Sequence, residues 1–363
     1  MTDQDRAGRA FAFEGNWREF APIAFTNLLL TLVTLGVYIF WARTRERRYL
    51  WSRTRFIDER LEWGGTGFEL FLGYVMALLF LIAPIVLVQF GAQALAIRNH
   101  VGLAGLLIFG IYILVFYLIG VAIFRALRYR LSRTFWRGIR GGSDDPGLAY
   151  GLSHLWKTAV GSLALGLLIP WSMVSLWNER WNAMSFGPFR FRSGATSGPL
   201  MGRFLLYYLV PVVAAVGMFV VVGSFASAPR TVSPGQGPGD FQAAVALTIL
   251  AFYLIFFVLL GFVALFYYSA YFREVVGHLE LGDLEFEFDA TTADWFKLIL
   301  GNFALVIVTL GIGALFLGYR NWSFFVRHLN AYGALDLDSF TQSTTRAPGQ
   351  GEGLLDAFDV GAF

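Results

Sequence analysis

The stretch NLLLTLVTLGVYIFWARTRERRY, from Asn27 to Tyr49, decides the fold, because parts of it return twice in the chain at fixed spacing. Its first half is an uncharged apolar run that ends at Trp41, and its second half is rich in arginine and aromatic residues. An apolar helix that runs into arginines and aromatic rings is typical of a membrane span where it meets the lipid headgroups.

The recurring segments align with one another without a gap. One offset aligns Asn27 with Asn302 and also aligns the tripeptide Thr-Leu-Gly at 34–36 with the same tripeptide at 309–311. A second, shorter offset aligns Leu-Gly at 35–36 with Leu-Gly at 165–166, and Trp41 with Trp171. Ungapped matches of tryptophan, glycine and asparagine indicate an internal repeat.

The composition is that of a membrane protein. Of the 363 residues, 56% are hydrophobic and only 15% are charged, and the mean hydropathy is +0.59. A soluble domain is about a quarter charged. The first ten residues are polar, so we expect no signal peptide and an uncleaved first anchor. The chain has no cysteine, which excludes disulfides, thiolate metal sites and cysteine nucleophiles.

A helix needs about 20 apolar residues to span the hydrocarbon. Continuous rather than alternating apolar runs favour helices over barrel strands. The sequence therefore predicts an all-α polytopic membrane protein with about seven transmembrane helices, near residues 20–41, 69–97, 102–124, 152–171, 201–227, 242–271 and 295–318. Residues 1–340 form a single membrane domain in this prediction, and 341–363 form a flexible C-terminal tail.

The spans group as 3+3+1, in repeat units of about 11–140, 141–285 and 286–340. With three spans per unit, equivalent segments of the first two units would cross in opposite directions, as in many transporters. The loop at 125–140 is rich in arginine and its equivalent at 274–289 is acidic, which supports inversion in part.

A rival layout keeps four spans and lets 20–41, 152–171 and 295–318 enter the membrane and return, so that every arginine-rich region lies inside. We favour seven spans, because a re-entrant hairpin needs a turn near its middle and NLLLTLVTL has no Gly or Pro there.

The run from Thr34 to Tyr49, with the upstream FAFEG of residues 11–15 and Asn27, resembles the YjgN-like family of bacterial inner-membrane proteins, a domain of unknown function. The family pattern places a proline before the tryptophan. Pro-Trp at 170–171 matches it, whereas the other two units have Phe40 and the pair Leu-Phe at 315–316. The resemblance implies a location in the bacterial inner membrane and no known activity.

Polar residues inside the apolar segments are candidates for a pathway. Asn27, Lys157 and Asn302 share one aligned position, and His154 lies one turn before Lys157. A helix–helix hydrogen bond, worth about 0.6 kcal/mol, is the favoured alternative for the asparagines, while the two interpretations stand about even for Lys157.

Two further sets of residues are candidates. Gly36, Gly166 and Gly311 are candidate hinges, although close helix packing by small residues is the favoured interpretation. A collar of basic and aromatic side chains is a candidate for contact with lipid headgroups: Arg43, Arg45, Arg47, Arg48, Tyr49 and Trp51.

Two hypotheses for function follow. The first is an inner-membrane protein that transports or handles a small amphipathic or lipid-like molecule, and the alternative is a non-transporting scaffold or envelope-stress component that binds protein partners. The expected partners are membrane lipids rather than nucleic acid, because the arginines adjoin apolar spans. The four histidines lack metal-ligand spacing and the common catalytic motifs are missing, so we expect no metal, no cofactor and no enzyme.

Overall fold

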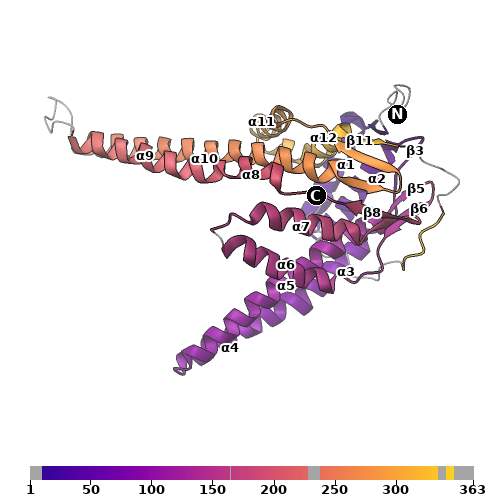
Figure 1. Ribbon diagram of the computed structural model, residues 1–363, viewed down its shortest axis with the longest axis horizontal. Coiled ribbons are helices and arrows are strands. Elements are labelled where there is room, and N and C mark those ends of the chain that lie inside the picture. Colours follow the sequence, from indigo (N-terminus) through magenta and orange to yellow (C-terminus); the bar gives the residue numbers. More distant parts are fainter. Residues whose placement is uncertain (1–9, 164, 228–237, 334–340, 347–363) are drawn as a thin grey trace.

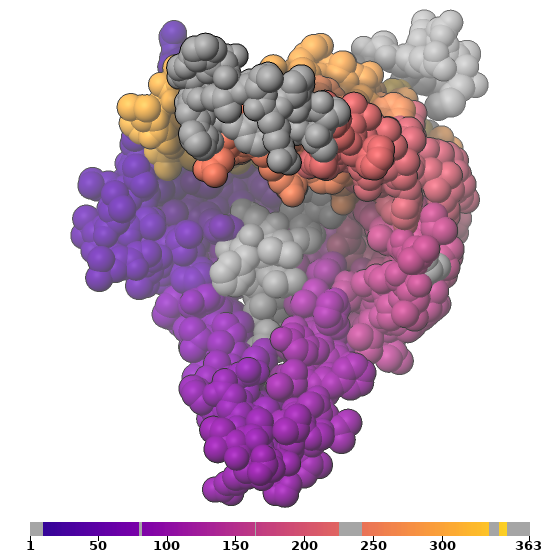
Figure 2. Space-filling view, turned by 90° about the vertical axis from the view of Figure 1, so that its left-hand side faces the viewer, coloured from indigo at the N-terminus to yellow at the C-terminus, as the bar shows by residue number. Residues whose placement is uncertain are grey.

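The structure is a computed structural model that describes residues 10–163, 165–227, 238–333 and 341–346. Short strands gather at one end of the molecule, and helical hairpins project from them (Figure 1). Seen from the tips of the hairpins, α4–α5 (purple) and α9–α10 (red to orange) lie on opposite sides, with α6–α7 (magenta) on one flank (Figure 2). The hairpins are therefore spread around the strand end rather than bundled.

Two of the hairpins are long. In the first, α3 (Gly67–Ala77), a π-helical turn (Leu78–Ile82) and α4 (Ala83–Ile97) precede α5 (Val101–Arg133). In the second, α8 (Gly198–Phe204) and α9 (Leu206–Ser227) precede α10 (Pro238–Gly277). These helices correspond to four of the seven predicted spans. Among the described residues, three helices are long and apolar enough to cross a membrane: 101–133, 198–224 and 242–277.

The other three predicted spans are not single helices. Each is divided by a turn into two antiparallel arms, so the prediction of continuous spans over 20–41, 152–171 and 295–318 is wrong. The arms are α1 (Trp17–Val33) with α2 (Ile39–Ser52), α6 (Leu148–Leu163) with α7 (Ile169–Asn182), and α11 (Thr292–Val308) with a 3-10 turn (Ile312–Phe316) and α12 (Leu317–His328).

The turn lies at the Leu-Gly pair, where the stretch searched for a helix breaker ends at Leu35 and Gly36 follows directly after it. After α1 the Leu35 N–H donates to the carbonyl of Leu32, and the Gly36 N–H donates to that of Thr31 at 2.8 Å. This is the Schellman arrangement that ends many helices. Its C′ position usually holds glycine, but here leucine takes it, with φ of 50° at Leu35.

The strand end contains a sheet that the all-α prediction omitted. Its strands have two to five residues, too few for a periodic pattern to stand out. They are β1 (Phe11–Phe13), β2 (Thr54–Phe56), β3 (Glu59–Arg60), β4 (Glu62–Trp63), β5 (Thr134–Trp136), β6 (Ile139–Gly142), β7 (Ser185–Phe186), β8 (Phe189–Ser193), β9 (Leu279–Leu281), β10 (Leu284–Phe288) and β11 (Leu329–Tyr332).

Strands β4 to β11 form one antiparallel sheet in chain order, and β1, β2 and β3 form a second. The sheet joins strands from loops that the inverted layout places on opposite sides of the membrane. One continuous sheet cannot be divided by a bilayer, so the sheet argues against the predicted inversion of the units. The described residues show two long hairpins alternating with three short ones, rather than a 3+3+1 order of spans.

The two sheets curl toward each other, so that the first and last strands are neighbours. β1 packs against β11 and α12. The Tyr319 hydroxyl of α12 donates to the Gly15 carbonyl at 2.9 Å, and the Trp322 ring stacks on Trp51 with 4.1 Å between centroids. The strand end is therefore a nearly closed ring that joins the beginning of the chain to its end.

Part of the predicted C-terminal tail packs on this ring. The Gln342 amide donates to the Gly138 carbonyl at 2.9 Å and its oxygen accepts from the Arg140 N–H at 3.2 Å. The remainder of the tail, residues 347–363, lies outside the described residues, as does most of the Pro- and Gly-rich loop near 228–237.

Candidate functional site

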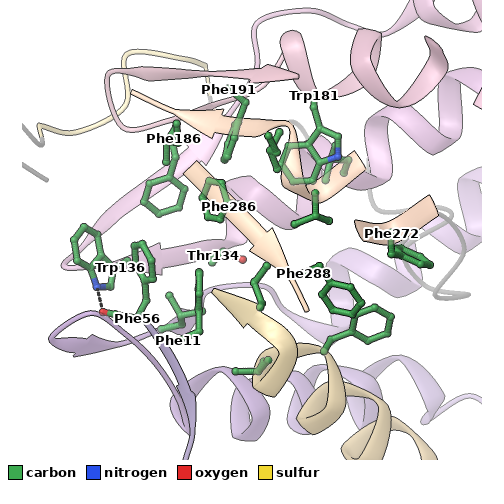
Figure 3. Close-up of a pocket in the computed structure, with 18 of the residues that line it drawn as sticks. Phe11, Phe56, Thr134, Trp136, Trp181, Phe186, Phe191, Phe272, Phe286 and Phe288 are labelled. Atoms are coloured by element: carbon green, nitrogen blue, oxygen red, sulfur yellow. Dashed lines mark hydrogen bonds between the residues drawn. The ribbon is translucent and has the colours of Figure 1, made fainter. Parts of the chain in front are cut away.

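The ring of strands surrounds a cavity of about 320 Å³ that is partly open to the outside. Aromatic side chains from strands far apart in the sequence converge on it (Figure 3), among them Phe11, Phe56, Trp136, Phe191 and Phe286. The ends of α5, α7, α10 and α12 complete the lining. Of its described residues, all are Phe, Trp, Leu or Val except Thr134 and Arg180.

Strand alternation explains why the rings point inward. In β10 the sequence LEFEF alternates Phe with Glu, and in β8 the sequence FRFRS alternates Phe with Arg. Successive side chains of a strand point to opposite faces, so the charges face outward while Phe191, Phe286 and Phe288 face the cavity. These two short period-2 runs were the signal in the sequence that could have revealed the site.

Hydrogen bonds from tryptophans hold the cavity wall together. The Trp136 indole N–H donates to the Phe56 carbonyl at 3.0 Å, and the two rings meet edge to face (Figure 3). The Trp51 indole donates to the Thr134 hydroxyl at 2.9 Å, and that of Trp322 donates to the Thr54 hydroxyl at 2.9 Å. Each of these bonds links two segments that are far apart in the chain.

Arg180 is the charged residue of the lining, on the last turn of α7. It is only 6% exposed, and its guanidinium lies over the Trp177 ring at 5.4 Å. Sequence analysis did not select this residue, because nothing in the sequence alone shows that it faces an enclosed space.

The candidate pathway residues lie elsewhere, and each joins the two arms of one short hairpin. Asn27 is 3% exposed; its amide donates to the Ala42 carbonyl at 3.1 Å, and its oxygen accepts from Arg45 at 3.1 Å. Asn302 accepts from the Arg320 Nε at 2.7 Å and donates to Asn321 at 2.9 Å.

The second hairpin has an ion pair in the same place. Lys157 donates to the Glu179 carboxylate at 2.6 Å, across α6 and α7. His154 packs against Gly120 of α5, where any side chain larger than hydrogen would collide with it. The structure therefore places these residues as braces within separate hairpins and does not bring the three aligned positions together.

The candidate hinge glycines all have positive φ, 93° at Gly36, 80° at Gly166 and 94° at Gly311, and lie in the hairpin turns. A Cβ at Gly36 or Gly311 would meet nothing within 4 Å. Close helix packing is therefore not the reason for glycine at these two positions, and the left-handed backbone is.

The predicted headgroup collar is divided between two environments. Arg47 and Trp51 are buried, with Arg47 over the Trp63 ring and Trp51 stacked on Trp322. Both residues face the protein interior instead of lipid. Arg48 is exposed, whereas Arg43, Arg45 and Tyr49 are half-buried. The Tyr49 hydroxyl donates to the Asn16 carbonyl at 2.8 Å, which fixes the start of α1.

Comparison with known proteins assigns a family to this architecture. A family model described as a bacterial protein of unknown function (DUF898) matches residues 9–357. The chain belongs to this family. Three curated relatives are each named inner membrane protein YjgN. The one from Salmonella typhimurium is 26% identical over 142 residues, which are 39% of this chain and 33% of that protein.

The relative from Escherichia coli O157:H7 is 26% identical over 140 residues, 39% of this chain and 32% of the relative. The relative from Escherichia coli strain K12 is 29% identical over 89 residues, which are 24% of this chain and 22% of that protein. The matches thus span a third or less of the curated relatives. No solved structure matches the chain. With its membrane-length helices, the protein is a bacterial inner-membrane protein, which confirms the predicted family and location.

Proposed function

We propose that this family member is a multi-pass protein that binds a small amphipathic, lipid-like molecule in the aromatic cavity. The cavity itself is the observation that carries the proposal. Pockets for small molecules usually enclose about 300–1,000 Å³ and are lined by apolar and aromatic side chains with a few polar groups. A cavity of about 320 Å³ with one threonine and one arginine in its lining fits that description.

The exposed surfaces of the hairpins support membrane insertion. Apolar side chains such as Phe219 of α9, Leu103 of α5 and Leu254 of α10 are more than half exposed, which in water would be a large apolar patch. The helices α5 and α10 have 33 and 40 residues, about 50 and 60 Å, so they cross a hydrocarbon core of about 30 Å and extend beyond it.

The tips of the short hairpins support entry into the bilayer from one side. Leu35 and Leu310 are each 94% exposed and Leu165 is 85% exposed, although a turn in water rarely presents leucine. We therefore favour four crossings with three re-entrant hairpins, in place of seven crossings. The arginines at 125–140 and 43–60 then share the strand end, which the positive-inside rule places in the cytoplasm.

The cavity lies where the membrane helices meet the strands. Leu127 of α5, Phe272 of α10 and Phe325 of α12 line it, and each is close to the charged end of its helix. A lipid-like molecule at the inner surface of the membrane is therefore the ligand within reach. The described lining residues offer no pair of nucleophile and base, so we propose binding and not catalysis.

The test is to fill the cavity. Val326 is buried in the lining, so Val326→Phe places a ring in the space, whereas Val216→Phe makes the same change at an exposed position of α9. The purified protein in zwitterionic nanodiscs is titrated with the neutral fluorescent probe N-phenyl-1-naphthylamine, and protein-free nanodiscs are subtracted.

We expect saturable binding by the wild type and by Val216→Phe, and a loss of at least tenfold in affinity for Val326→Phe. A wild type that adds no signal to that of empty nanodiscs, or a Val326→Phe variant with wild-type affinity, would overturn the proposal.

A further inference from the structure

We infer that the ligand carries an anionic head, a carboxylate or a phosphate, which Arg180 binds inside the cavity. The inference rests on the proposed function, because it names the chemical class of the molecule that the aromatic cavity holds.

The guanidinium of Arg180 has no counter-charge in the described residues. It makes neither a hydrogen bond nor an ion pair with them, and its buried Nε has no acceptor. A buried charge without a partner costs several kcal/mol. The helix dipole at the last turn of α7 and the Trp177 ring at 5.4 Å return only part of this cost. The fold alone therefore does not account for an arginine at this place.

Two neighbouring donors are unpaired in the same way. The indole N–H groups of Trp177 and Trp181 are buried without a hydrogen-bond partner in the described part of the chain, and both rings line the cavity. Residues three and four apart share one helix face, so these two donors and Arg180 lie on one side of α7. An anionic oxygen head accepts hydrogen bonds from donors of this kind.

At the strand end of the other two short hairpins the indoles are paired, although the buried indole of Trp295 at the start of α11 has no partner among the described residues either. The indoles of Trp51 and Trp322, near the same ends of α2 and α12, each donate to a threonine hydroxyl at 2.9 Å. The repeat register sharpens the contrast, because the offsets that relate the three hairpins align Arg180 with Leu50 in the first and with Phe325 in the third. Two of the three hairpins thus use an apolar residue where α7 has arginine.

The charges nearest Arg180 do not neutralise it. Glu179, the adjacent residue, forms its ion pair with Lys157 at 2.6 Å. The buried phenols of Tyr150 and Tyr271 lie close enough to interact electrostatically with Arg180, but a phenol is neutral at physiological pH. The pocket around Arg180 is therefore positive and surrounded by apolar side chains.

The volume indicates how much of the ligand the cavity holds. At about 30 Å³ for each water-sized group, a cavity of about 320 Å³ seats roughly ten non-hydrogen atoms, and the rest of a longer molecule extends through its open side. A single chain of about ten carbons, with its anionic head and the adjoining part of the chain in the cavity, fits both the space and the charge. Free fatty acids and phosphate esters share this chemistry.

The experiment displaces N-phenyl-1-naphthylamine with four competitors of one chain length: decanoate, decyl phosphate, decanol and decyltrimethylammonium. It compares the wild type with Arg180→Leu, Arg180→Gln and Arg192→Gln. Leucine stands at the equivalent position in the first hairpin, so Arg180→Leu is suited to the fold. Arg192 is exposed on β8, and its substitution by glutamine changes the net charge by the same amount.

We expect at least one of the two anions to displace the probe from the wild type at a concentration at least tenfold below that of decanol. The preference, taken within each variant as the ratio of the displacing concentrations of decanol and of each anion, disappears in both Arg180 variants. Arg192→Gln retains the preference. The tighter of the two anions then identifies the head as carboxylate or phosphate.

Equal displacement by decanol and by both anions in the wild type would overturn the inference and leave the proposed function intact, as would an anion preference that survives in Arg180→Leu. Absence of probe binding by the wild type would instead refute the proposed function itself.

Discussion

At the scale of the residue, leucine in the left-handed region is the unusual choice of this chain. Leu35 and Leu310 have φ of 50° and Leu165 has 53°, and all three point away from the protein. An L-residue other than glycine costs about 1–2 kcal/mol there. The exposed leucine side chain makes no packing contact with the described residues that offsets this cost. An apolar side chain at this place therefore suits the lipid into which we propose that the hairpin tip inserts.

A glycine substitution tests this explanation. Leu35→Gly removes the strain but increases the entropy of the unfolded chain, so we expect the stability in detergent to stay constant or rise by up to about 1 kcal/mol. Leu32→Gly, on the exposed face of α1, is expected to lower it by about 1 kcal/mol. Thermal unfolding followed by circular dichroism compares the two variants. Equal losses in both would show that Leu35 is packed against something.

At the scale of the element, the ungapped alignment selected three segments that each form a helical hairpin, but it did not predict that conformation. The tripeptide Thr-Leu-Gly was visible, yet an apolar run long enough for one membrane span is also long enough for two short arms. What decides between them is the backbone at Leu-Gly, together with the polar residue that joins the arms. Helix propensity reveals neither the turn at Leu-Gly nor the polar residue that joins the arms, because leucine is a good helix former.

A double-mutant cycle tests the brace in the third hairpin. Asn302→Ala and Arg320→Ala each remove the bond of 2.7 Å, and we expect a coupling energy of about 0.6 kcal/mol, the average for polar pairs in membrane proteins. The control cycle pairs Asn302→Ala with Arg192→Ala, and the two distant changes are expected to add. A coupling near zero in the first cycle would leave Asn302 free for another role.

At the scale of the whole molecule, the sheet determines the arrangement. Composition and pattern were sufficient to predict a membrane protein, the family resemblance and the four long helices. The sheet was missed because most of its strands have only two to four residues, so that the period-2 runs of β8 and β10 were the one local signal, and because the pairing between hairpins joins distant parts of the chain. The aromatic cavity was missed with it, since the rings of β8 and β10 meet only when the sheet has formed.

The arrangement of the sheet predicts which parts of the chain lie on the same side of the membrane. In this cysteine-free chain, Glu62→Cys and Gly194→Cys lie at exposed positions of the strand end, and His100→Cys lies at the tip of the α4–α5 hairpin. We expect a membrane-impermeant maleimide to label His100→Cys in intact cells and to label the other two only after lysis. External labelling of Gly194→Cys without Glu62→Cys would restore the inverted layout.

The closure of the ring also bears on how the protein is made. β1 ends at Phe13 and its neighbour β11 ends at Tyr332, so most of the chain separates the two ends of the closure. At about 5–20 residues per second, the ribosome needs tens of seconds to produce that interval. During this time the membrane helices enter the bilayer while the cavity is still open on one side. A prematurely terminated copy can therefore be fully inserted and still lack the closed ring around the cavity, so the proposed binding would require complete synthesis of the chain.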